Sequence, residues 1–397
     1  METERQEMTR WPIVPLGDFV AKKSSSVNPA MFPGEVFDLY SIPAFDAGQP
    51  DVCAGSEIGS AKQVVQPNDV LLSRIVPHIR RAWVVGESQD RRLIASGEWI
   101  VFRSPQIRPG YLRYFLIGDS FHTQFMQTVS GVGGSLLRAK ATEVAKIKIP
   151  VPPLAEQERI VKLLDEGDEL RRLRAQADRR TADLIPSLFH EMFGENAKKP
   201  HVRVKLEQIA KVVSGVAKGR KFNGRLPVEV PYLRVANVQA GHLDLSEIKT
   251  IQALPEEVEE LALRKGDVLL TEGGDFDKLG RGAMLEEELP NCIHQNHVFR
   301  VRVEQSKLDP VYFAKFLLTG EARGYFLGCA KRTTNLASIN MTQLRALPVL
   351  LPPLPQQKEF AARVSDIRAM QAEQAASCRR LDDLFHSMLH RAFQGEL

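Results

Sequence analysis

The sequence predicts an α+β protein in which two mixed α/β domains are joined by two long antiparallel coiled-coil helices, with a pseudo-two-fold repeat. Three observations lead to this prediction. A Pro-Pro-Leu-x-x-Gln segment at 152–157 returns at 352–357. The match continues without a gap as far as Phe193 and Phe393. Strand and helix patterns also recur in the segments between, and a repeat of half the chain length indicates two copies of one architectural unit.

The composition indicates a folded protein with several compact units. The chain has 397 residues, of which 43% are hydrophobic and 26% charged, and this length suits roughly two to four units. No stretch approaches the roughly 18–20 apolar residues of a membrane span, and the polar start of the chain does not resemble a signal peptide. Four scattered cysteines without a Cys-x-x-Cys pair fit free thiols in a reducing cytoplasm, where we expect the protein to be located.

The net charge of +4 is unevenly distributed along the chain. Residues 1–154 carry a net charge of +2 and residues 195–354 a net charge of +4, whereas the repeated segments are neutral or acidic. The positive excess therefore lies between the repeated segments. It permits nucleic-acid binding but does not require it.

The segments 10–150 and 196–349 are predicted to be the two mixed α/β domains. Both contain an Asp-Val-Leu-Leu strand, at Asp69 and at Asp267. The later segments WIVFRS and HVFRVRV alternate apolar and basic residues, which is typical of half-buried strands. Each is followed by an amphipathic helical pattern, over 110–126 and 310–327.

Segments 151–195 and 350–397 are predicted to be the long helices, because each begins with a Pro-Pro pair and then has apolar residues at alternating steps of three and four. Arg174 and Gln374 interrupt the pattern, either to fix the register or as a solvated break. Pro186, which His386 replaces in the second copy, should kink or end the first helix. Each helix would span roughly 58 Å, more than one turn of B-DNA at about 34–36 Å, and would hold two objects at a fixed distance. The predicted seam residues are Ile160, Leu163, Leu170, Leu184 and Leu188 in the first helix, and Phe360, Ile367, Met370, Leu381, Leu384 and Met388 in the second.

These elements together resemble the specificity (S) subunit of type I restriction-modification systems. The resemblance rests on the two Pro-Pro-Leu-x-x-Gln segments, the Asp-Val-Leu-Leu strands, PYLRVANVQ at 231–239 and TTNLASINMTQLRALPVLLPPLPQQ at 333–357. It implies that 10–150 and 196–349 are target recognition domains, each for one half of a bipartite sequence in double-stranded DNA. The helices would set the gap between half-sites and dock two methyltransferase (modification) subunits.

The same resemblance implies that this chain holds no catalytic centre and no cofactor. S-adenosylmethionine would be bound by the methyltransferase partner, and ATP with Mg by a motor-nuclease (restriction) subunit. The residues agree with this expectation. An amino-methyltransferase needs an Asn/Asp-Pro-Pro-aromatic loop, but Val151 and Leu351 precede the Pro-Pro pairs, and a leucine follows each. Cys292, His294 and His297 lack a further cluster to complete a zinc site, so no metal site is predicted.

Two other functions remain open from the residues alone: a stand-alone DNA methylase or nuclease, and a coiled-coil scaffold whose domains bind proteins. For DNA contact, loops rich in Arg, Lys, Thr, Asn and Gly are the candidates, because phosphates need cations and base edges need bidentate donors. In the first domain the candidates are Arg74, His78, Arg80, Arg81, Arg138 and Lys140; in the second they are Lys218, Arg220, Lys221, Arg225, Lys278, Arg281, Lys331, Arg332, Thr333 and Asn335.

Overall fold

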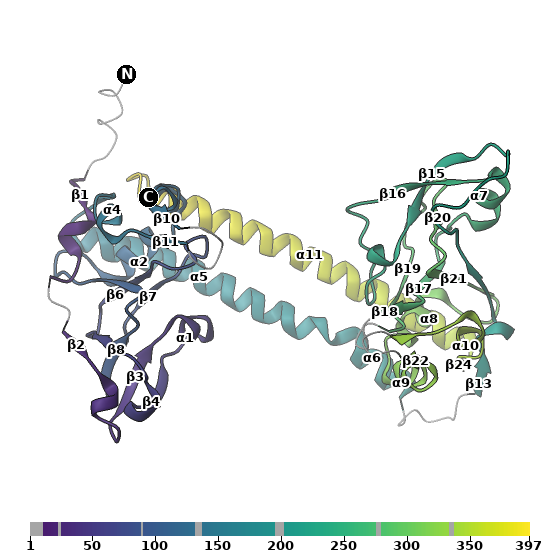
Figure 1. Ribbon diagram of the computed structural model, residues 1–397, viewed down its shortest axis with the longest axis horizontal. Helices are drawn as coiled ribbons and strands as arrows, with labels where there is room; N and C mark the ends of the chain where they lie inside the picture. The colour runs from purple at the N-terminus through teal and green to yellow at the C-terminus, as the bar shows by residue number, and fades with distance from the viewer. Residues whose placement is uncertain are drawn as a thin grey trace. The chain divides into compact units, whose positions relative to one another are not determined.

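The computed structural model describes residues 11–22, 25–88, 90–131, 137–194, 202–274, 279–332 and 337–397. The chain forms two compact units (Figure 1). The first unit combines residues 1–176 with 375–397, and the second unit comprises 177–374. Each unit therefore contains one globular part and lengths of the long helices, which is a different grouping from four consecutive domains.

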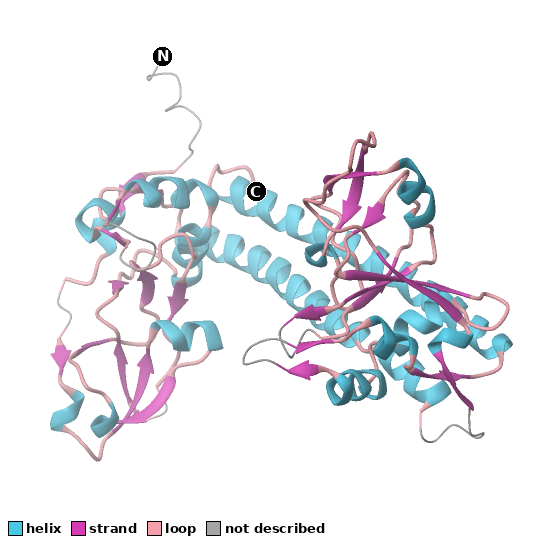
Figure 2. Ribbon diagram, turned by 45° about the vertical axis from the view of Figure 1, so that its right-hand side comes forward, coloured by secondary structure: helices cyan, strands magenta, loops and turns pink. Residues whose placement is uncertain are grey.

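The two larger sheets of the first unit are an inner sheet near the long helices and an outer sheet further away (Figure 2), and two-stranded pairs β1-β12 and β10-β11 accompany them. The inner sheet has the order β7-β6-β9 and the outer sheet β2-β5-β8-β3-β4. The strands are β1 (Ile13–Pro15), β2 (Ser26–Val27), β3 (Val36–Tyr40), β4 (Asp51–Ala54), β5 (Lys62–Val64), β6 (Val70–Ser73), β7 (Ala82–Val84), β8 (Arg92–Ala95), β9 (Trp99–Phe102), β10 (Val129–Ser130), β11 (Arg138–Ala139) and β12 (Lys148–Pro150). The helices are α1 (Ile42–Ala47), α2 (Pro109–Ile117), α3 (Asp119–Gln127), α4 (Ala141–Val144) and α5 (Leu154–Ala182), which ends in the second unit.

The second unit repeats this plan with an inner sheet of order β14-β21-β17-β19 and an outer sheet of order β16-β15-β20. Its strands are β13 (Val202–Lys205), β14 (Ala210–Ser214), β15 (Val228–Leu233), β16 (Lys249–Ala253), β17 (Val268–Thr271), β18 (Gly273–Gly274), β19 (Gly282–Met284), β20 (Ile293–His294), β21 (Val298–Val303), β22 (Lys331–Arg332), β23 (Ala337–Ser338) and β24 (Pro348–Leu351). Its helices are α6 (Leu184–Phe193), α7 (Pro255–Leu261), α8 (Pro310–Phe316), α9 (Gly320–Cys329), α10 (Met341–Arg345) and α11 (Leu354–Ala392), which ends in the first unit.

The Asp-Val-Leu-Leu motif forms a central strand of each inner sheet, β6 and β17, and all four residues of each strand are buried. The aspartate just before each strand is also buried. Asp69 accepts two hydrogen bonds from Arg103, both 2.6 Å long, and Asp267 accepts two from Arg302, both 2.7 Å long. Each carboxylate also accepts a backbone N–H from three residues earlier, at 2.8 Å. The motif thus couples a buried aspartate, paired with a partly exposed arginine, to a tight turn before the strand.

The repeated glutamine of Pro-Pro-Leu-x-x-Gln is a buried link between each long helix and its globular part. Gln157 and Gln357 are both fully buried. The amide oxygen of Gln157 accepts the N–H of Arg108 at 2.7 Å, and its amide nitrogen donates to the carbonyl of Pro152 at 2.8 Å. Gln357 repeats the pattern, with the N–H of Asp309 as its donor at 2.8 Å. These bonds satisfy backbone groups at the start of α2 and α8, so the motif positions both elements.

Two kinds of predicted element differ from the structure, the helical patterns after the strands and the strands themselves. The helical patterns over 110–126 and 310–327 each form two helices, because the chain turns at Gly118 in the first and before Gly320 in the second. The strands predicted to be half-buried are almost wholly buried. Arg300 of β21 is only 1% exposed, and its guanidinium donates to the carbonyl oxygens of Glu260 and Ala262 at the end of α7. These bonds compensate part of the cost of removing the charged group from water.

The first long helix is interrupted as its proline predicts. α5 ends at Ala182 and α6 begins at Leu184. Pro186 has no N–H to donate to the carbonyl of Ala182, and its ring would clash with that carbonyl in a continuous helix. With His386 at the equivalent position, α11 continues without a break to Ala392.

Within each unit, the paired lengths of helix run in opposite directions. In the first unit Arg159 donates to the carbonyl oxygen of Leu397 at 2.6 Å, and Arg171 pairs with Asp382 at 2.6 Å. The residue numbers therefore rise along α5 where they fall along the paired segment. In the second unit Thr181 donates to the side-chain oxygen of Gln374 at 3.0 Å. Gln374, predicted as an interruption, is therefore part of a polar contact between helices.

The predicted apolar seam needs correction. Leu170 and Leu384 are each 55% exposed, and Leu184 and Met370 are each 38% exposed, so these four residues do not fill a seam within the described chain. Polar pairs make contacts between the helices near them, Arg171 with Asp382 and Thr181 with Gln374. Ile160 and Phe360 are buried, but within the cores of the globular parts. The other predicted seam residues are half-buried: Leu163, Leu188, Ile367, Leu381 and Met388.

His294 makes the stability of the second unit dependent on pH. Its side chain is fully buried, Nδ1 donates to the carbonyl of Val298 at 2.7 Å, and Nε2 has no partner among the described residues. Burial lowers its pKa from 6.5 to about 4. Protonation therefore favours the unfolded chain, and stability should fall as the pH drops from about 6.5 to about 4, by about 3 kcal/mol in total. Urea denaturation followed by circular dichroism across this range measures the loss. The variant His294→Met should lose most of that dependence, and an unchanged pH profile would contradict the assignment.

Candidate nucleic-acid interface

In the first unit the fold brings together two basic segments that lie far apart in sequence. The N–H of Ala139, in β11, donates to the carbonyl of Arg74, just after β6, at 2.8 Å. Between these segments, Glu98 pairs with Arg74 at 3.1 Å and with Arg138 at 3.0 Å. The hydrogen bonds from Arg138 are the main cause of the lowered pKa of the Glu98 carboxyl. Two guanidinium groups are thus held side by side, a geometry suited to phosphate or base-edge acceptors.

The other candidates of the first unit divide into internal and exposed residues. Arg81 is only 8% exposed and donates two hydrogen bonds, at 3.0 and 2.9 Å, to Asp46 of α1. This internal pairing removes it from the set of DNA contacts. Arg80 pairs with Asp119 at 2.6 Å, and this bond lowers the pKa of the Asp119 carboxyl. The remaining candidates of this unit are exposed: His78 and Lys140.

The second unit repeats the meeting of the two segments with different side chains. β18, just after β17, pairs with β23, and β23 pairs with β22. The N–H of Ile339 donates to the carbonyl of Glu272 at 2.8 Å, as Ala139 does to Arg74. Where the first unit has the Arg74–Glu98 pair, the second has Glu272 with His297, at 2.6 Å. The framework is the same, and the polar side chains at its edge differ.

The loop between β14 and β15 presents further basic residues of the second unit. Lys218 and Lys221 are exposed. Arg220 forms a two-bonded ion pair with Glu257 at the start of α7, and the hydrogen bonds that it donates to Glu257 raise the pKa of Arg220. Arg225 pairs with the neighbouring residue of α7, Glu256. Two arginines therefore anchor the loop, and two lysines remain directed to solvent.

Arg281 donates to the side-chain oxygen of Gln239 at 2.8 Å and is half-buried. Lys278, Thr333 and Asn335 lie outside the described residues, and Lys331 and Arg332 are described only as the backbone of β22.

The pairing residues Glu98, Glu272 and His297 were not predicted from the sequence. Glu98 and His297 stand directly before the strands β9 and β21, and Glu272 directly after β17. Aligning the two strands that flank each pair would have shown these positions facing one another. Among the described residues, the structure places no group of three or more His, Cys, Asp or Glu side chains where they could hold a metal ion. No helix in the described ranges is long and apolar enough to cross a membrane.

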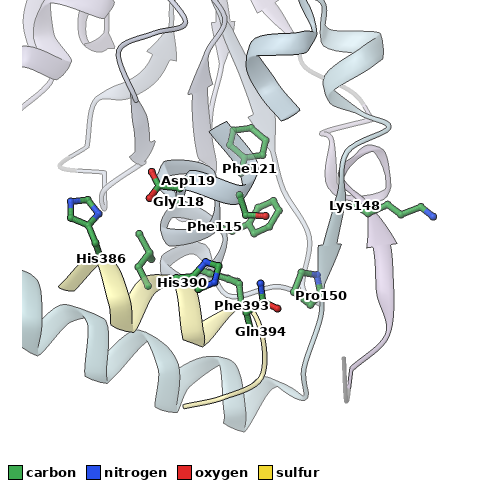
Figure 3. Close-up of a pocket in the computed structure, with 12 residues that line it drawn as sticks. Phe115, Gly118, Asp119, Phe121, Lys148, Pro150, His386, His390, Phe393 and Gln394 are labelled. Atoms are coloured by element: carbon green, nitrogen blue, oxygen red, sulfur yellow. The ribbon is translucent and has the colours of Figure 1, made fainter. Parts of the chain in front are cut away.

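The repeat extends to surface hollows beside the long helices. In the first unit, Figure 3 shows His386 and His390 of α11 near Phe115 and Asp119. Phe115 also packs against Phe393 with ring centroids 5.3 Å apart. An equivalent hollow of the second unit is lined by Pro186, His190, Leu318 and Gly320. Both units therefore offer a comparable surface beside the end of a long helix.

The two units thus share one framework whose matching edges carry different polar side chains. The sequence matches the family described as "Type I restriction modification DNA specificity domain" over residues 62–177 and 199–375. These stretches cover more than half of the chain, and the chain belongs to this family. It is a DNA-specificity component of a type I restriction-modification system and not itself the enzyme, which confirms the resemblance drawn from the sequence.

Individual relatives are similar over most of their length. The EcoKI specificity subunit of Escherichia coli K12 is 25% identical over 364 residues, 84% of this chain and 76% of that protein. The MjaVIII specificity subunit of Methanocaldococcus jannaschii is 27% identical over 390 residues, 90% of this chain and 86% of that protein. The HsdS subunit from Thermoanaerobacter tengcongensis has the same fold, with a TM-score of 0.51, 22% identity and coverage of 98% and 97% of the two chains.

Proposed function

We propose that each globular part recognises one half of a bipartite sequence in double-stranded DNA. The long helices would then set the gap between the half-sites. One observation carries this proposal: both units bring the segment after β6 or β17 against a second loop segment, through the same backbone bonds at 2.8 Å. The side chains at that edge differ, with arginines on Glu98 in one unit and Glu272 on His297 in the other. A shared framework with different polar edges suits two different base sequences.

The decisive experiment exchanges one globular part. Residues 10–150 are replaced with the equivalent segment of a relative, the chain is produced with its methyltransferase subunits, and methylated positions are mapped across the host genome. We expect one half-site of the motif to change while the other half-site and the methylation frequency stay the same. A change in both halves would contradict recognition by separate parts. The absence of any bipartite motif with the unmodified chain would favour a protein-binding scaffold instead.

The long helices are proposed to dock two methyltransferase subunits. Leu170 and Met370 occupy equivalent positions in the repeat, as do Leu184 and Leu384, and all four are exposed. The first unit holds Leu170 with Leu384, and the second holds Leu184 with Met370. A repeated pair of exposed apolar side chains suits a partner present in two copies. In this proposal S-adenosylmethionine is bound by the methyltransferase subunits, and ATP with Mg by restriction subunits.

A further inference from the structure

Each unit presents an apolar side chain to solvent just before a proline that precedes a strand of its outer sheet. Phe32 precedes Pro33 ahead of β3, and Leu226 precedes Pro227 ahead of β15. Both sequences continue as Pro-x-Glu-Val. Leu226 is 87% exposed, the highest value among the large apolar residues that the structure describes, while Phe32 is 43% exposed and its neighbour Met31 74% exposed. An isolated exposed leucine is common, but the same feature at the same place in two divergent units requires a shared explanation.

The loop of the second unit holds Leu226 in this exposed position. The ion pairs of Arg220 and Arg225 with α7 fix the loop on both sides of its turn. Within the turn, the N–H of Arg225 donates to the carbonyl of Phe222 at 3.0 Å. The following Pro227 restricts the backbone of Leu226 to extended conformations. The leucine is therefore presented by a braced loop and cannot easily fold back onto the sheet.

The loop of the first unit is braced by close backbone packing. The N–H of Phe32 donates to the carbonyl of Pro29 at 2.8 Å. A Cβ atom on Gly55 would lie only 2.2 Å from the carbonyl oxygen of Phe32 and 2.4 Å from that of Pro29, so only glycine allows this approach. The guanidinium of Arg92 lies over the Phe32 ring, 4.8 Å from its centroid. One face of the ring is thus packed while the rest stays in solvent.

The charges around these side chains favour DNA as the occupant. Lys218 and Lys221 are exposed on the same loop as Leu226, and the guanidinium of Arg92 lies over the Phe32 ring. Exposed cations contact phosphates, and leucine, phenylalanine and methionine are side chains that enter DNA grooves to contact thymine methyl groups or to wedge between base steps. We propose that Leu226 in the second unit, and Phe32 with Met31 in the first, make apolar contacts with bases in a DNA groove and contribute to half-site specificity. This inference rests on the proposed function.

The test compares Leu226→Ala with the unmodified chain, both assembled with methyltransferase subunits, on duplexes with and without the mapped bipartite site. Fluorescence anisotropy should show affinity for the site falling about tenfold, equivalent to about 1.4 kcal/mol. Affinity for DNA without the site, and the salt dependence of binding, should stay unchanged because the lysines remain. Leu226→Met should restore site affinity. Leu245→Ala, which truncates another exposed leucine of the same unit (37% exposed), should have no effect.

A second readout locates the contact. With 2-aminopurine placed at successive positions, Leu226→Ala should change its fluorescence in only one half-site, and Phe32→Ala in only the other. Unchanged site affinity for Leu226→Ala would overturn this inference while leaving the proposed function intact. An equal loss on both kinds of duplex, or a loss of methyltransferase subunits instead of DNA, would also overturn it. If the unmodified complex shows no bipartite preference, the proposed function fails and this inference fails with it.

Discussion

Replacement of Asp69 with alanine is expected to lower the free energy of unfolding of the first unit by about 2–4 kcal/mol. The carboxylate is fully buried and accepts three hydrogen bonds, two from Arg103 and one from the N–H of Gln66. Its removal leaves a buried backbone donor without a partner and a guanidinium without its counter-charge. Arg103 is about one-third exposed and can turn toward water, which is why the expected loss stays below the upper range for buried pairs.

The three tryptophans allow this loss to be measured for one unit alone. Trp11, Trp83 and Trp99 all lie in the first unit, so tryptophan fluorescence during urea denaturation follows that unit, while circular dichroism follows both. Asp69→Ala should shift the fluorescence midpoint strongly. Glu143→Ala, which removes an ion pair with the exposed Lys146, should change stability by less than about 1 kcal/mol. Similar shifts for the two variants would show that the Asp69–Arg103 pair contributes no more to stability than an exposed ion pair.

The repeat could be predicted because its most regular parts depend on local sequence. Pro-Pro followed by a long polar-apolar pattern specifies the start of a helix, and Asp-Val-Leu-Leu specifies a turn followed by a buried strand. The role of Gln157 was not predictable. Its three bonds connect it to backbone groups about fifty residues earlier as well as to Pro152, and no local pattern reports contacts over that distance.

The seam was only partly predicted because apolar periodicity does not say which surface covers an apolar residue. Leu170 and Leu384 fit the alternating pattern, but Arg171 and Asp382 occupy the contact between the helices instead. Arg171 also lies over the Phe385 ring, 4.5 Å from its centroid. A long arginine side chain can cover apolar surface while its charged group is paired, so a polar residue replaced the expected leucine at the contact.

The prediction of DNA contacts was limited in the same way, because the sequence does not show which residues pair with the candidate arginines. Arg74 and Arg138 could be predicted as basic loop residues, but their common carboxylate on Glu98 depends on how the loops meet. Arg81 has the same local sequence character as Arg80. Only the fold shows that it is buried against Asp46.

The largest effect on assembly is expected from the exposed apolar residues of the long helices. The double substitution Leu170→Glu with Leu384→Glu should remove one methyltransferase subunit, because a charge buried in an apolar contact costs several kcal/mol, equivalent to a loss of affinity of about 100-fold or more. Leu184→Glu with Met370→Glu should remove the other subunit. Light scattering of the purified complexes should give two partner subunits for the unmodified chain and one for each double variant.

A control variant and a measurement of stability accompany this test. Leu245→Glu places the same charge on an exposed leucine of a globular part and should leave both partner subunits bound. Because all four helix residues are at least 38% exposed, their substitution should not shift the urea transitions. Two subunits on every variant would show that docking does not use these positions. Loss of both subunits from a single double variant would mean that the two docking events are coupled, whereas the repeat predicts that each unit carries its own.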